Sequence, residues 1–180
     1  LHWTEINWVS EIKQRFSPPE EAKVEALDAD LEQLVVDGTI DAFLAPSTKD
    51  GKKPKEEQNL RRLFPDTETE ERKYYNKTGI YPLNHAIVIH QDILAAYPNC
   101  PKPLFEAYCE SKKQFYAEGG KINPWGDDAD GHDFIQFGLT KKNREIVGTL
   151  LRYLYEQKFI TRVPEVDELF VQGAGEWADQ

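Results

Sequence analysis

The sequence predicts an α/β protein with two lobes, and three stretches carry this prediction. The run from Ala86 to Ile89 is apolar without polar alternation, which is typical of a short strand covered on both faces. Residues 31–45 have the pattern of a helix, a glycine and a strand, which is half of a β-α-β unit. Residues 141–157 carry apolar side chains at helical spacing. We therefore expect short buried strands flanked by amphipathic helices, with a change of lobe before Thr78.

The N-terminal third contains two predicted strands and one predicted helix. Trp3 to Val9 is rich in β-forming residues and predicts a strand. Asp30 is expected to cap a short helix, and Gly38 occupies the position that follows the end of such a helix. Ile40 to Ala45 then predicts a buried strand, which carries one charge at Asp41. We expect the strand at Trp3 to Val9 to supply the other half of the β-α-β unit.

The C-terminal part of the chain is predicted to be rich in helices. The last stretch, from Gly173 onward, is expected to fray, as chain ends often do. The predicted helices cover residues 67–76, 91–97, 101–119 and 141–157, the last with Thr140 as its N-cap.

Composition bounds the partners and the compartment. Hydrophobic residues make up 39% and charged residues 30% of the 180, which is typical of a globular protein, and no run is long enough to span a membrane. The net charge of −10 disfavours nucleic acid and anionic membrane surfaces as partners. The chain begins at Leu1 and contains no methionine, so we expect it to be a piece of a longer protein.

No stretch predicts a metal or a cofactor. Cys100 and Cys109 form neither a disulfide framework nor a metal-binding spacing. The acidic run from Asp127 to Asp133 resembles a calcium loop but lacks the alternating ligands and the terminal glutamate of an EF-hand. We interpret this run as a solvated turn.

Five residues are candidates for chemistry, and each has a plain structural alternative. His85, at the start of a predicted strand, is a candidate proton donor, or else a satisfied polar residue at the sheet boundary. His90 precedes a predicted helix and is more simply its cap. Tyr81 is a candidate for the wall of a ligand site, or else a turn residue. Asn143 and Arg144 lie in the first turn of the long predicted helix, where an arginine can bind a carboxylate or simply face solvent.

Several of these residues belong to an ordered set of motifs. In order and spacing, from near Trp3 to Phe170, the set resembles the 4,5-dihydroxyphthalate decarboxylase family. Two positions differ from the family's usual pattern: Asn84 stands before the histidine, and Phe137 stands where tyrosine is common. The motifs are Gly38-Thr-Ile-Asp-Ala42, Arg62-Leu-Phe-Pro-Asp66, Tyr74-Tyr75 through Thr78-Gly-Ile-Tyr-Pro82, His85 with Ala86–Ile89, and Tyr153-Leu-Tyr-Glu-Gln157.

The resemblance implies a fold like the type II periplasmic binding proteins. In that fold two α/β lobes are joined by crossing strands, and the ligand lies in the cleft between them. Residues 1–62 would then be part of the second lobe. Residues 63–180 would contain the crossover and the helix-rich C-terminal part of the first lobe, and the N-terminal part of the protein would be absent.

The resemblance also implies a reaction, the loss of one carboxylate from a hydroxylated aromatic acid such as 4,5-dihydroxyphthalate. Such a reaction needs an acid near the ring and a cation for the retained carboxylate. We assign His85 as the acid and Arg144 as a carboxylate clamp, with Tyr81 and Asn143 as cleft groups. The enzyme would require no cofactor and would be cytoplasmic. The alternatives are a periplasmic substrate-binding component of an ABC-type transporter and an inactive fragment.

Overall fold

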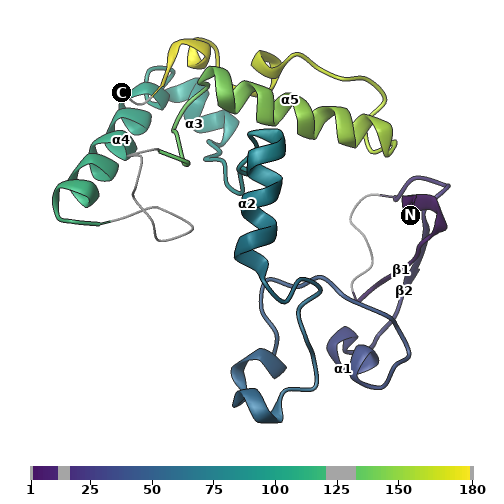
Figure 1. The fold of residues 1–180 in the computed structure, drawn as a ribbon. Helices are drawn as coiled ribbons and strands as arrows, with labels where there is room; N and C mark the ends of the chain where they lie inside the picture. The colour runs from purple at the N-terminus through teal and green to yellow at the C-terminus, as the bar shows by residue number, and fades with distance from the viewer. Residues whose placement is uncertain (1, 12–16, 121–132, 179–180) are drawn as a thin grey trace. The chain divides into compact units, whose positions relative to one another are not determined.

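The computed structural model describes residues 2–11, 17–120 and 133–178 (Figure 1). Its helices and strands fall into two compact units, which we describe one at a time. The first unit comprises Leu1–Glu70 with Gln157–Phe159, and the second comprises Glu71–Glu156 with Ile160–Gln180. The predicted two-lobed fold, with a boundary near residue 62, stays a prediction.

The first unit contains one two-stranded parallel sheet. Strand β1 (Asn7–Ser10) pairs with β2 (Lys23–Ala26) along its whole length. The predicted strand at Trp3–Val9 is therefore shifted, because Trp3–Glu5 forms a 3-10 helix that precedes β1. Its partner is β2 and not the predicted strand at Ile40–Ala45. We did not predict β2, in which only Val24 is half-buried.

Helix α1 (Leu31–Val36) forms where the capping residues predicted it. The Asp30 side chain accepts a hydrogen bond from the Glu32 N–H at 3.1 Å, which satisfies one of the free donors of the first turn. Gly38 adopts a φ of 72°, a left-handed conformation that glycine reaches without a steric penalty. Both predictions about this helix are confirmed.

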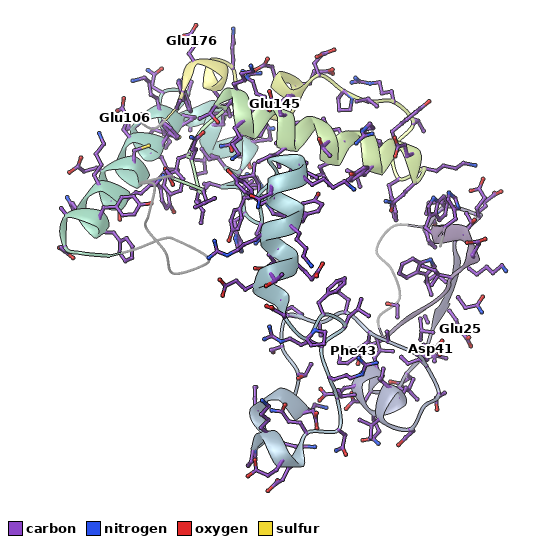
Figure 2. The ribbon with its side chains drawn as sticks, in the orientation of Figure 1. Glu25, Asp41, Phe43, Glu106, Glu145 and Glu176 are labelled. Atoms are coloured by element: carbon purple, nitrogen blue, oxygen red, sulfur yellow. The ribbon has the colours of Figure 1, made fainter. Side chains whose placement is uncertain are left out.

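The predicted buried strand at Ile40–Ala45 is wrong. This segment has no strand structure, and the Leu44 side chain is 99% exposed. Asp41 and Phe43 lie in the same irregular segment, after α1 (Figure 2). Because β1 and β2 pair only with each other in the described part of the chain, the segment has no neighbouring strand to join.

Residues 46–58, predicted as a solvated loop, contain two 3-10 helices at Asp50–Lys52 and Lys55–Glu57. The buried carboxylate of Asp50 accepts hydrogen bonds from the N–H groups of Asn59 and Leu60. A single side chain therefore closes this loop.

The second unit is built from helices (Figure 1), and their residue ranges are close to the predicted ones. Thr140 caps α5 (Lys141–Glu156) as predicted, because its hydroxyl accepts a hydrogen bond from the Asn143 N–H at 3.1 Å. The helices are α2 (Thr67–Thr78, whose first turns belong to the first unit), α3 (Gln91–Ala96), α4 (Pro101–Ala117) and α5 (Lys141–Glu156), with 3-10 helices at Val166–Leu169 and Ala174–Glu176.

The core of the second unit lies against α5. Ile146 and Leu151 of this helix are buried, as are Leu139 and Ala174. The expectation that residues after Gly173 fray is wrong for the described residues, which end at Ala178. Leu139 donates its N–H to the Trp177 carbonyl at 2.9 Å, and the Trp177 ring lies 5.7 Å from that of Phe105. These contacts hold the C-terminal segment in place.

The predicted strand at Ala86–Ile89 is also wrong. Residues 79–90 contain no helix, strand, turn or bend, and Ile87 and Val88 are exposed. A β-forming run becomes a strand only beside another strand, and the described residues offer it none.

Among the residues that the structure describes, no helix is both long and apolar enough to cross a bilayer.

Candidate functional site

The N-terminal turn of α5 is the best-organised polar region of the second unit. Asn143 is only 5% exposed, and its side-chain amide donates hydrogen bonds to the carbonyls of Gln136 (2.7 Å) and Gly138 (2.8 Å). These two bonds fix the loop that leads into the helix. Asn143, predicted as a cleft group, therefore has its amide nitrogen committed to the backbone.

Arg144 already binds a carboxylate, that of Asp167. Its two terminal nitrogens each donate a hydrogen bond of 2.9 Å to one oxygen of Asp167. Its remaining bonds go to the backbone carbonyls of Leu139 and Gly175, both at 3.2 Å. The hydrogen bond from Arg144 lowers the pKa of the Asp167 carboxyl, so the pair is charged at neutral pH. The predicted clamp is occupied by a partner within the chain.

Lys142 is a second cation in the first turn of α5, and it lies beside an aromatic ring. Its ammonium group donates a hydrogen bond to the Tyr75 hydroxyl at 2.6 Å and lies 4.5 Å from the centre of that ring. The Tyr75 ring meets Phe134 edge-on, with centroids 5.2 Å apart. Tyr81 lies on Phe134 as well, at 6.1 Å. Tyr81 therefore shares a ring neighbour, Phe134, with Tyr75.

A hollow of about 600 Å³ opens beside this turn. Its walls come from the start of α5, the loop before it, and the end of α2 with the residues that follow. Among the described residues that line it, Glu145, which projects from α5 (Figure 2), is the one acidic group, and Lys141 and Lys142 are the cations. The residues around it are Thr78, Gly79, Ile80, Gln136, Thr140, Lys141, Lys142, Glu145, Ile146 and Thr149.

The hollow combines two features that suit an organic anion. The ammonium groups of Lys141 and Lys142 and the positive end of the helix dipole favour a carboxylate. Ile80 and Ile146 supply apolar surface for the rest of a ligand.

His85, the predicted acid, is not part of this hollow. It is exposed in the irregular segment between α2 and α3. His90 has the plainer role foreseen for it, because its ring caps α3 and accepts a hydrogen bond from the Asp92 N–H at 3.2 Å. Among the described residues, those that line the hollow include none of the predicted site residues Tyr81, His85, Asn143 and Arg144.

Sequence reasoning missed Lys142, Tyr75 and Phe134. The adjacent lysines directly after the helix cap Thr140 were a usable signal, because cations are unfavourable in a first turn unless another interaction compensates. No local pattern links Tyr75 to Lys142, since 67 residues separate them.

The first unit has a larger hollow, of about 840 Å³, with a different character. Four carboxylates face two lysines around it, which disfavours an anionic ligand. These charged residues are Glu11, Asp28, Asp30, Glu32, Lys49 and Lys52.

The described residues contain no cluster of histidine, cysteine and acidic side chains suited to a metal ion. Within the acidic run at Asp127–Asp133, only Asp133 is described, and it forms an ion pair with Lys112. The other residues of that run, and the interpretation as a solvated turn, lie outside the described residues.

No family model matches this chain, and no curated protein matches it significantly. The resemblance to the decarboxylase family therefore rests on the ordered motifs alone.

Proposed function

We propose that this chain binds a hydroxylated aromatic carboxylic acid, such as 4,5-dihydroxyphthalate, in the hollow beside α5. The observation that carries this proposal is that Lys141 and Lys142 line the hollow at the N-terminus of α5, where Lys142 also donates a hydrogen bond to Tyr75. A carboxylate would bind at the ammonium groups, and the ring would lie against the apolar wall. Thr78, Gly79 and Ile80, which line the hollow, belong to one of the resembling motifs.

We further propose that the chain belongs to a carboxy-lyase, and this step rests on the resemblance. Protonation of the ring carbon that bears the leaving carboxylate allows the carbon–carbon bond to break. The bonding electron pair restores the aromatic ring, and carbon dioxide leaves. His85 supplies the proton in this proposal, and a lysine holds the retained carboxylate in place of Arg144. The protein would have the type II periplasmic-binding-protein-like fold and act in the cytoplasm.

A substrate-binding component of a transporter is the second candidate. One observation favours it: the described residues that line the hollow include cations and apolar side chains but no histidine. Such a site can hold a carboxylate without delivering a proton to a ring. A protein of this kind would be periplasmic and would return its ligand unchanged.

The test measures binding and turnover of 4,5-dihydroxyphthalate by the same preparations. Calorimetry reports binding, and chromatography reports protocatechuate and carbon dioxide. We expect Lys142→Met to weaken binding by about ten- to a hundredfold, because a charged hydrogen bond to a carboxylate is worth roughly 1.5–3 kcal/mol. Lys113→Met, which removes an exposed lysine of α4, is the matched control and should bind normally.

The outcomes separate the candidates. Turnover that His85→Ala abolishes, with binding retained, supports the carboxy-lyase and the role of His85. Turnover that His85→Ala leaves unchanged removes His85 from the mechanism. Tight binding without turnover favours the transporter component, and the absence of both rejects this ligand class.

A further inference from the structure

The segment from Pro82 to Ile89 is an exposed strand-forming run that lacks a strand partner. No backbone N–H or carbonyl of these residues forms a hydrogen bond with another described residue. Val88 is 88% exposed and Ile87 is 56% exposed. β-branched residues favour the extended backbone, and an extended backbone with free donors and acceptors is a template for pairing with another strand.

The segment also lacks the features that normally protect such an edge. No Asp, Glu, Lys or Arg occurs from Thr78 to Gln91, although 30% of the chain is charged. Natural edge strands usually carry charges, most often lysine, that oppose pairing with another chain. The charged side chains that give the chain its net charge of −10 therefore all lie outside this segment, and none within it repels a second copy.

The sequence of the segment complements itself. In an antiparallel pair related by a two-fold axis at Val88, Val88 faces Val88 of the second copy, and Ile87 faces Ile89 on each side. All three central cross-strand pairs then consist of β-branched residues, the kind that stabilises a sheet. His85 would lie outside these pairs.

We propose that two copies of this chain pair through Ile87, Val88 and Ile89 as an antiparallel β-ladder about this two-fold axis. The ladder would satisfy the free backbone groups and cover the exposed β-branched side chains. This proposal is independent of the proposed ligand and activity.

Sedimentation over a range of concentrations tests the pairing. We expect wild-type chain to form a dimer, and Val88→Lys to raise the dimer dissociation constant at least about tenfold, because two like charges would then face each other. Leu44→Lys is the matched control, since it introduces the same charge at an equally exposed apolar residue of the first unit and should dimerise normally. Val88 is exposed, so the substitution should leave the circular dichroism spectrum of the monomer unchanged.

Hydrogen exchange provides the second readout. Alternate amides of residues 86–90 should exchange slowly in the dimer and rapidly in Val88→Lys. A wild-type chain that stays monomeric at about 100 μM, where specific dimers of even modest affinity associate, overturns the proposal. A dimer that Val88→Lys does not weaken, or one that leaves these amides unprotected, overturns it as well.

Discussion

Asp50 shows how one buried carboxylate can organise a loop. Its side chain accepts hydrogen bonds from the N–H groups of Leu60 (2.8 Å) and Asn59 (2.9 Å), and it forms an ion pair with Lys53 at 2.9 Å. The hydrogen bond from Leu60 contributes most to lowering the pKa of Asp50 to about 2, followed by the hydrogen bond from Lys53.

This shift predicts how the loop responds to acid. The folded pKa lies below the unfolded value of about 3.9, so the stabilisation is complete above that value and is lost as the pH falls through about 2. The protection factors of the Asn59 and Leu60 amides, measured against the intrinsic exchange rate at each pH, should therefore stay high at pH 4 and fall near pH 2. In Asp50→Asn the same amides should lose this pH dependence. Loss of protection centred near pH 4 in the wild-type chain would contradict the assignment.

Lys158 is the one described residue other than glycine that has a positive φ, at 62°. A side chain in this conformation costs roughly 1 kcal/mol, and glycine removes the cost. Lys158→Gly should therefore raise the free energy of unfolding by about 0.5–1 kcal/mol, measured by urea denaturation. Lys158 also pairs with Glu21 at the surface, where an ion pair contributes little. Glu21→Gln removes that pair without changing the backbone, and a gain of the same size there would refute the conformational explanation.

At the scale of elements, α4 is joined to the loop before α5 by a buried lysine. The Lys112 ammonium group contacts the Asp133 carboxylate, donates to the Ile135 carbonyl at 2.6 Å, and lies 4.6 Å from the centre of the Phe137 ring. A buried cation is tolerated only when paired in this way. Lys112 thus fixes a loop whose end leads into the candidate site.

Removing this cation should loosen the loop. We expect Lys112→Met to lower the free energy of unfolding by about 2–3 kcal/mol, because the carbonyl of half-buried Ile135 and the partly buried carboxylate of Asp133 lose their charged donor. Lys113→Met, at the exposed neighbouring position, should change it by less than about 0.5 kcal/mol. Urea denaturation of both variants measures the difference. Equal effects at the two positions would show that the buried contacts of Lys112 contribute nothing.

Helices were predicted well from the sequence, and strands were not. Local signals define a helix, and the Asp30 cap, Gly38 and the Thr140 cap each identified a helix end. A strand depends on a partner that is distant in sequence. The residues at Ile40–Ala45 and Ala86–Ile89 have the composition of strands but no partner in the described structure.

At the scale of the whole molecule, the candidate site was predicted only in part. The first turn of α5 was identified from the sequence, whereas Tyr81 contacts Phe134 and does not line the hollow. The commitment of Arg144 to Asp167 could not be foreseen, since 23 residues separate them and Asp167 carries no local signal. Lys142 and Tyr75 are in contact although they are even further apart in the sequence, by 67 residues. Positions within one helix follow from periodicity, whereas contacts between elements depend on how they pack.

The uncharged stretch from Thr78 to Gln91 also determines which reagents can detect it. Trypsin needs lysine or arginine, and probes that modify amines or carboxyl groups need charged side chains, so none of them reacts within this stretch. A surface map made with those tools would leave these exposed residues blank. The imidazoles of His85 and His90 and the phenol of Tyr81 are its reactive side chains for such mapping, and the two histidines stand on either side of the apolar run.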